Sequence, residues 1–495
     1  MVFSSHLFLF YFLPAALLLY YLMPRAGKHI LLTLVSYVFY GWANPLFMGL
    51  LLVSTLIEYI AGLVIAWNGF HWGTTAPVLA VGAPRTRKQR AAFVVSICSN
   101  LSLLGFFKYF NFAVENIDAL AAWLGWPGLG IVLRVTLPLG ISFYTFQSMS
   151  YAIDVYRGQA AALRSFVDLA CYVAMFPQLL AGPIIRFSEV ADQLVHRVCT
   201  VEKFARGVAF LCLGLSKKIL LANPCGKIAD VAFLAASPST PDAWYGIFAY
   251  AFQIYFDFSG YSDIAIGLGL MLGFVFAKNF DSPYKAKSIS EFWRKWHISL
   301  SSMLRDFIFL PLAYAISRRI TSARLLGMRA ESWSYYPAMF LTMLLCGLWH
   351  GAAWNFVIWG GIHGGLLGFE RIFGKRSLYT RAPRALRIAA TFLMVLVAWV
   401  FFRAPDLPAA FQYLGRMAGF GTPAANAFLA QGIFYQPYYL LTMVVAGGVT
   451  WLAPQTWDWT REISWPKALV ILGAGMLAVA VLFTQSYNPF IYFIF

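Results

Sequence analysis

Long, continuous apolar runs separated by short polar gaps fill most of this chain. They lie near residues 6–23, 29–42, 45–67, 92–107, 112–126, 168–181, 204–222, 243–276, 352–372, 386–402, 436–453 and 467–485. Many reach or approach the roughly 20 apolar residues with which a helix crosses the hydrocarbon layer. Because the runs are continuous rather than alternating, they predict helices and not the strands of a barrel. We expect an all-α polytopic membrane protein with roughly 10–12 transmembrane helices.

Proline, glycine and hydroxyl residues interrupt this pattern at two places. The first is LPLGISFYTFQ at 137–147, and the second is AGPIIR at 181–186. Non-helical backbone at membrane depth is tolerated only where protein or a cavity covers it. We therefore predict a broken or re-entrant helix around 137–155, in addition to the spanning helices.

Composition excludes a soluble protein. Hydrophobic residues make up 60% of the chain and charged residues only 12%, whereas soluble domains have about 25% charged residues. No internal repeat and no soluble domain interrupts the apolar pattern. We expect one membrane domain over 1–495, with a C-terminal group of transmembrane helices at 405–495.

Basic residues gather in the gaps between apolar runs. The net charge is +17, with clusters at 85–90, 318–329 and 375–387. The positive-inside bias predicts that these loops are cytoplasmic and lie near membrane lipid. A nucleic-acid partner would need a soluble basic face, so we expect none. The six cysteines show no C-x-x-C spacing, which argues against a structural disulfide framework and against a metal site.

Three histidines occur within or beside apolar segments: His297, His350 and His363. Ionisable side chains inside a membrane usually face a protein interior or a water-filled cavity. His350 ends an apolar run and precedes Gly351, which leaves room beside the ring. A pKa near 6.5 suits imidazole to take a proton from a hydroxyl or thiol, so we predict that His350 is catalytic. His363 lies among glycines that favour close helix packing, and packing is our interpretation for it.

A polar stripe follows from reading 290–308 as one helix. Helical spacing then places Arg294, His297, Ser301 and Arg305 along one face. Such a helix could lie at the membrane interface with its arginines on lipid phosphates. For His297 we favour a functional role, because imidazole is a poor lipid anchor.

Two carboxylates, Asp257 and Asp263, lie around Gly260 in the apolar run 243–276. Their six-residue separation does not place them on one helix face. They could orient His350 or His297, pair with Arg305, or line a polar channel. The remaining candidates for binding or orienting substrate are Asp306, Trp349 and Asn355.

Several catalytic signatures do not occur in the chain. There is no GxxxxGK[ST], GxGxxG after a strand, H-E-x-x-H or G-x-S-x-G. ATP-driven transport, nicotinamide chemistry, zinc proteolysis and elbow-type hydrolysis therefore lose support. A non-enzymatic transporter or flippase, with the two aspartates at a midplane site, stays open at this point.

Ordered segments over most of 1–373 carry a family resemblance. They include YFDFSGYSDIAIGLGLMLGF (255–274), SPYKAKSISEFWRKWHISLSSMLRDFIF (282–309) and LTMLLCGLWHGAAWNFVIWG (341–360). Matching segments also occur at 1–14, 137–158 and 176–187. The chain resembles the membrane-bound O-acyltransferase (MBOAT) family, and within it the bacterial alginate O-acetylation branch.

The resemblance implies a ring of helices around a central tunnel, with 1–373 as the family-like core. His350 matches the family's invariant histidine and His297 a second recurrent one. It implies acyl transfer from a thioester, acetyl-CoA or an acyl carrier, to a hydroxyl, with no bound cofactor. It also implies the inner membrane of a bacterium, an envelope polysaccharide such as an exopolysaccharide, and a periplasmic acetyltransferase partner. D-alanyl transfer to a cell-wall polymer is the alternative within the family.

Overall fold

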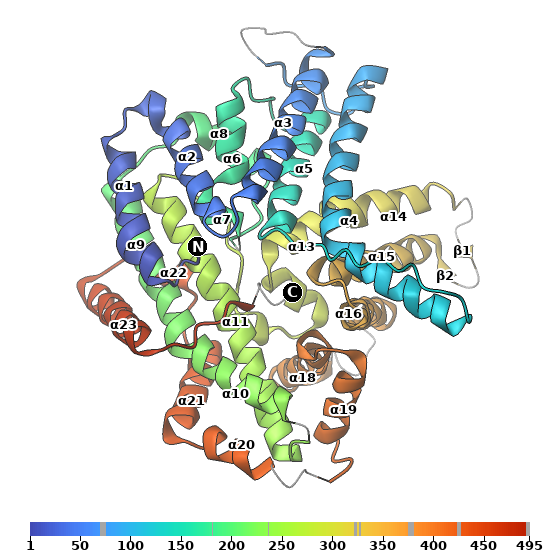
Figure 1. Ribbon diagram of the computed structural model, residues 1–495, viewed down its shortest axis with the longest axis vertical. Coiled ribbons are helices and arrows are strands. Elements are labelled where there is room, and N and C mark those ends of the chain that lie inside the picture. Colours follow the sequence, from blue (N-terminus) through green and yellow to red (C-terminus); the bar gives the residue numbers. More distant parts are fainter. Residues whose placement is uncertain are drawn as a thin grey trace. The chain divides into compact units, whose positions relative to one another are not determined.

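The computed structural model describes residues 1–69, 76–180, 182–235, 237–320, 324–325, 328–374, 381–422 and 427–491 (Figure 1). Helices dominate these residues. The strands in the described part, β1 (Arg324–Leu325) and β2 (Met328–Arg329), form one short antiparallel pair. The predicted all-α class is therefore confirmed. The basic residues Lys375 and Arg376, predicted to be cytoplasmic, lie outside the described residues.

Five helical segments in the described part are long and apolar enough to cross a membrane. They are α3 (Leu46–Trp67), α4 (Arg87–Trp123), the segment Ile298–Ser317, α18 (Arg384–Arg403) and α23 (Trp465–Thr484). The chain is a multi-pass membrane protein. The larger count of spans, the central tunnel and the single-domain organisation stay predictions.

The chain forms two compact units. The first comprises Met1–Leu211 and Tyr261–Ala277, and the second Cys212–Gly260 and Lys278–Phe495. The boundary falls inside α11 (Thr240–Met271). The first unit also contains η1 (Phe8–Phe12), α1 (Leu13–Leu22), η2 (Arg25–Gly27), α2 (Lys28–Gly41), α5 (Ile141–Arg157), α6 (Phe166–Ala174), α7 (Phe176–Leu179), α8 (Phe187–His196) and most of α9 (Val201–Ser216).

Two boundary predictions in the first unit are wrong. Residues 92–126 were expected to form two helices, but α4 is one helix of 37 residues. No proline interrupts it, and Thr86 and Gln89 cap its start reciprocally. The expected break within 137–155 lies instead before the helix, at Gly140 (φ 73°), and α5 is continuous. A Cβ at Gly140 would lie 2.7 Å from the carbonyl oxygen of Leu179, so glycine is required there.

The second unit holds the three candidate histidines, His297, His350 and His363. Its elements are η3 (Lys217–Ala222), α10 (Asn223–Leu234), η4 (Pro283–Lys285), α12 (Ile289–Lys295), α13 (Ile298–Leu304), η5 (Arg305–Phe309), α14 (Leu310–Ser317), β1, β2, α15 (Ala330–His350), α16 (Trp354–Phe373), α18, α19 (Leu407–Met417), α20 (Ala427–Phe434), α21 (Pro437–Trp451), α22 (Thr456–Trp459) and α23. Helices α15 and α16 pack closely, because Gly347 and Gly360 let the two backbones approach.

The predicted single helix over 290–308 is wrong. Helix α12 ends at Lys295 and α13 begins at Ile298, with His297 between them in the left-handed conformation (φ 44°). The main chain there pairs with an earlier segment. The Asp281 N–H donates to the Lys295 carbonyl and the Ile298 N–H to the Asn279 carbonyl, both at 2.9 Å. These bonds replace the helical ones and fix the break.

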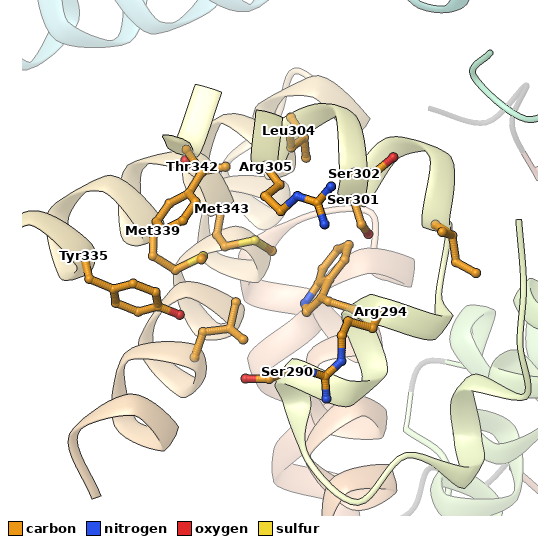
Figure 2. A pocket seen from close by; sticks show the side chains of 14 residues that line it. Ser290, Arg294, Ser301, Ser302, Leu304, Arg305, Tyr335, Met339, Thr342 and Met343 are labelled. Carbon is orange, nitrogen blue, oxygen red and sulfur yellow. The ribbon is translucent and has the colours of Figure 1, made fainter. Parts of the chain in front are cut away.

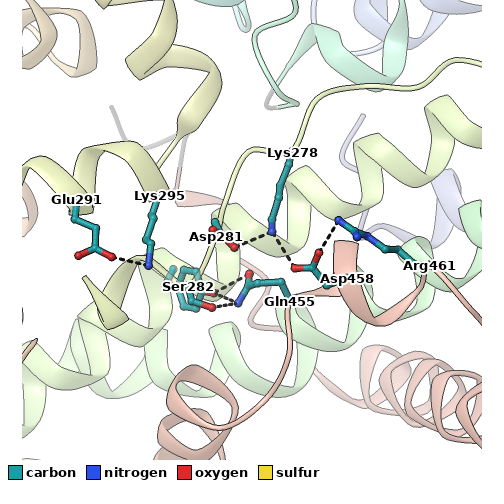
Figure 3. A network of polar contacts seen from close by, with 9 residues as sticks. Lys278, Asp281, Ser282, Glu291, Lys295, Gln455, Asp458 and Arg461 are labelled. Atoms are coloured by element: carbon teal, nitrogen blue, oxygen red, sulfur yellow. Dashed lines mark hydrogen bonds and ion pairs between the residues drawn. The ribbon is translucent and has the colours of Figure 1, made fainter. Parts of the chain in front are cut away.

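Polar contacts anchor α12 and the segment before it. The Lys278 ammonium bridges Asp281 (2.7 Å) and Asp458 of α22 (3.0 Å), as Figure 3 shows. Burial alone would raise the pKa of Glu291. The Lys287 N–H and the Lys295 ammonium outweigh that effect and hold this pKa below its ordinary value. Ion pairs and hydrogen bonds thus fix both the segment before α12 and the helix itself.

Glu370 of α16 caps the first turn of α12. Its carboxylate accepts bonds from the Ile289 N–H (2.5 Å), the Ser290 N–H (3.0 Å) and the Ser290 hydroxyl (2.8 Å). A carboxylate at a helix N-terminus satisfies N–H groups that have no partner within the helix. Glu370 therefore fixes the helix that carries Trp293 and Arg294.

Candidate active site

The three histidines lie in one aromatic cluster of the second unit. His350 is the last residue of α15, and its ring packs edge-on against Trp349 (4.8 Å between centroids) and Trp359 (5.0 Å). Trp349 also contacts His297 (6.3 Å), and Trp359 also contacts His363 (4.9 Å). Each of these two tryptophans thus contacts His350 and one of the other two histidines.

Hydrogen bonds assign the same tautomer to His350 and His297. Nδ1 of His350 lies 2.7 Å from the carbonyl oxygen of Cys346, and a carbonyl can only accept. Nδ1 of His297 lies 3.1 Å from Oδ1 of Asn279, which also accepts from the Ser299 hydroxyl (2.9 Å). In both rings Nδ1 carries the proton, and Nε2 carries the lone pair that could take a proton from a substrate.

His363 has the opposite tautomer. The Trp293 indole N–H donates to its Nδ1 (3.3 Å), and an indole nitrogen only donates. Nε2 therefore carries the proton, and the basic nitrogen is already engaged inside the protein. The side chain is fully buried. These contacts support the packing interpretation of His363.

Access distinguishes His350 from His297. His297 is 0% exposed, enclosed by Phe258 (4.6 Å between centroids) and Phe280. His350 is only half-buried. Part of His350 therefore remains exposed, whereas His297 is enclosed and contacts the site through Trp349.

A pocket of about 340 Å³ lies between α15 and the segments α12, α13 and η5. Figure 2 shows Tyr335, Met339 and Met343 of α15 on one wall, facing side chains from α12, α13 and η5. Met339, Met343, Cys346 and His350 recur at intervals of three and four residues, so they share one face of the helix. His350 lies seven residues beyond Met343, or about 10 Å along the axis.

The opposite wall carries two of the predicted arginines. Arg294, Ser301 and Arg305 all line this pocket. These three residues thus line one pocket although the single helix predicted for them is broken, and the break places His297 in the interior. One alternative was that Asp257 pairs with Arg305, but the described contacts of Arg305 do not include Asp257. Arg305 forms a two-point contact with Asp306, at 2.7 and 3.1 Å.

Asp257 has a structural partner. Its carboxylate pairs with Lys218 (2.7 Å) and accepts the Ile491 N–H (2.8 Å), and both side chains of the pair are at most 2% exposed. Lys218 also donates to the Pro489 carbonyl. The described contacts of Asp257 are thus with Lys218 and with Ile491 near the end of the chain, and not with a histidine. Its neighbour Phe258, however, packs against His297.

Of the other orienting candidates, Trp349 is the one whose described contacts include the histidines. Asn355 is buried and donates to the Ala404 carbonyl (2.7 Å), which joins the start of α16 to the end of α18. Asp263 is half-buried and belongs to the other compact unit. Trp349 does contact both His350 and His297, as a residue orienting them would.

Sequence reasoning missed Asn279, Trp359 and Glu370. Asn279 orients His297, Trp359 contacts both His350 and His363, and Glu370 fixes α12. Asn279 and Glu370 lie in segments without a repeating pattern, so the sequence carried no signal for them. Trp359 had a signal, since it lies on α16 one turn before His363 and therefore on the same face.

A half-buried histidine with a fixed tautomer, at the end of the helix that forms one wall of a pocket with two arginines, fits a group-transfer enzyme. A model of the MBOAT, membrane-bound O-acyltransferase family, matches residues 159–404. The "Probable alginate O-acetylase AlgI" of Azotobacter vinelandii is 44% identical over 85% of this chain and 79% of its own length. The chain belongs to the membrane-bound O-acyltransferase family and is an O-acyltransferase.

Two further relatives are similar to most of this chain, and one of them is named for a different acceptor. The Pseudomonas putida protein with the same description is 40% identical over the full length of both chains. A "Peptidoglycan O-acetyltransferase" from Helicobacter pylori is 34% identical over 85% of this chain and 80% of its own length. The transporter alternative is therefore wrong, because the chain is an acyltransferase by family.

Proposed function

We propose that the protein moves acetyl groups from a cytoplasmic thioester donor across a bacterial inner membrane, for O-acetylation of an exopolysaccharide or another envelope glycan. The observation that carries this proposal is His350, whose Nδ1–H is held by the Cys346 carbonyl at 2.7 Å while its ring stays accessible. The relatives named for alginate and peptidoglycan acetylation support an envelope polymer as the final acceptor.

In the proposed reaction, Nε2 of His350 acts as the base. It takes the proton from the attacking hydroxyl of the acceptor. The hydroxyl oxygen then bonds to the carbonyl carbon of the thioester donor. The tetrahedral intermediate collapses, the carbon–sulfur bond breaks, and the leaving thiolate receives the proton from the imidazolium. The Nδ1–H bond to Cys346 keeps the ring in one orientation throughout and stabilises the imidazolium.

The pocket supports a donor that carries phosphate. Arg294 and Arg305 supply two guanidinium groups, which suit phosphate oxygens. Met339 and Met343 on one wall and Trp293 on the facing wall supply apolar surface. Acetyl-CoA or an acyl-carrier prosthetic group would place its phosphate at the two arginines. Its arm, which ends in the thioester, would then lie along α15. A periplasmic acetyltransferase partner would then pass the acetyl group to the polymer.

Vesicle orientation tests the direction and the donor together. Labelled acetyl-CoA is added outside inside-out and right-side-out membrane vesicles that contain the protein, its envelope glycan and the partner. We expect labelled glycan only where the cytoplasmic face is outside. Equal labelling in both orientations contradicts transmembrane transfer. If neither orientation is labelled by acetyl-CoA but an acetylated acyl-carrier protein restores labelling, the carrier is the donor.

A further inference from the structure

A second pocket of the same unit lies away from the histidines. It has a volume of about 520 Å³ and is bounded by η3, α21, α22 and α23. Leucine and valine are the commonest residues of its walls, and its residues on α21 run from Tyr438 to Val449. Eleven residues of helix correspond to about 16 Å. The pocket is therefore a long apolar groove and not a compact polar site.

One lysine lines this groove. Lys217 is adjacent to Lys218, but the two side chains have different surroundings. Lys218 is 1% exposed and pairs with Asp257, whereas Lys217 is half-buried and lines the groove. Consecutive helix residues point about 100° apart. The Lys218 side chain therefore lies in the protein interior, and the Lys217 side chain lies at the groove.

The backbone conformation at Lys217 and the residues around it also indicate a binding site. Lys217 opens η3, a six-residue π-helix that continues α9 into α10. Such single-turn π segments occur frequently at functional sites. Ser216, Thr456 and Trp459 line the same groove, so hydroxyls and an indole accompany the lysine. Tryptophan is typical of the level at which lipid headgroups lie.

The groove opens on a membrane-facing helix. Leu477 of α23 forms part of its wall, and only 22% of the apolar window of α23 is buried within the protein. The exposed apolar surface of a spanning helix contacts lipid chains. A cation beside an apolar groove in this setting matches the two parts of one molecule, an acyl chain and an anionic headgroup.

We propose that this groove binds one anionic phospholipid, with its phosphate at Lys217 and an acyl chain along α21 between η3 and α23. The proposal concerns a site separate from the acyl-transfer residues and does not depend on the donor or acceptor assigned above.

Lipid-dependent stabilisation of the purified protein tests it. The probes are phosphatidylglycerol, phosphatidylcholine and inorganic phosphate, each added to the detergent-solubilised chain, with the thermal midpoint and lipid adducts in native mass spectra as readouts. We expect phosphatidylglycerol to raise the midpoint more than phosphatidylcholine, and phosphate alone to have no effect. Equal effects of the two lipids, or a full effect of phosphate, would overturn the proposal.

Substitutions locate the effect. Lys217→Gln should weaken phosphatidylglycerol binding about fivefold, and Lys217→Arg should retain it. Lys203→Gln is the matched control, because Lys203 lies on the same helical run and bonds the Val198 carbonyl outside the groove. Val445→Trp should fill the groove and reduce the binding of both lipids. Unchanged phosphatidylglycerol binding in both Lys217→Gln and Val445→Trp contradicts the site.

Discussion

The buried pair between Lys218 and Asp257 allows a quantitative prediction. Both side chains are at most 2% exposed and their charged atoms are 2.7 Å apart. Removing one partner from such a pair leaves an uncompensated buried charge, which costs about 3–5 kcal/mol. We expect Lys218→Met and Asp257→Asn each to destabilise the protein by about this amount.

The double variant is the informative one. Lys218→Met with Asp257→Asn removes both charges, and the asparagine oxygen can still accept the Ile491 N–H that now bonds Asp257 at 2.8 Å. We therefore expect the double variant to be more stable than either single variant. Arg461→Met is the control, since Arg461 is 67% exposed in its pair with Asp458 and such surface pairs contribute about 1 kcal/mol or less.

Thermal midpoints in detergent measure the stabilities, and acetyl transfer per folded molecule measures the function. If the losses of the two single variants simply add in the double variant, the side chains are not energetically paired and the reasoning is wrong. If Asp257→Asn is well folded yet transfers no acetyl group, Asp257 has a chemical role that its described contacts do not explain.

Three further predictions concern the site itself. Arg294→Gln and Arg305→Gln should each raise the KM for the acetyl donor with little change in kcat, and unchanged KM values would remove the arginines from donor binding. His297→Gly should be more stable than His297→Val by about 1 kcal/mol or more, because valine is strained at positive φ, with the order of thermal midpoints as the check. His363→Phe removes the acceptor of the Trp293 N–H and should cost about 1–3 kcal/mol, while transfer per folded molecule persists; loss of transfer in folded protein would contradict the packing role.

The helices of this chain were predictable where apolar runs are long and uninterrupted. The run 386–402 corresponds to α18 and 467–485 to α23, within two residues at each end. Local apolar pattern is sufficient there, because a spanning helix satisfies all its backbone groups internally. The same apolar pattern gave a wrong prediction for α4, because the polar residues near Lys108 interrupt the pattern but not the helix.

The site depended more on long-range contacts. His350 could be identified from its position after an apolar run, but its tautomer required the Cys346 carbonyl. The break at His297 was not predictable, because the hydrogen bonds that cause it come from Asn279 and Asp281. The partner of Asp257 was equally hidden, since Lys218 lies on another helix and Ile491 near the end of the chain.

The central claim is that His350 is the base for acyl transfer, and one comparison tests it most directly. His350→Ala and His363→Ala are expressed to equal levels of folded, membrane-inserted protein, and the rate of labelled acetyl transfer from the donor is measured for each. Loss of a general base should lower the rate by about 10²–10⁴-fold in His350→Ala, while His363→Ala retains transfer per folded molecule. Wild-type transfer by folded His350→Ala protein would contradict the account.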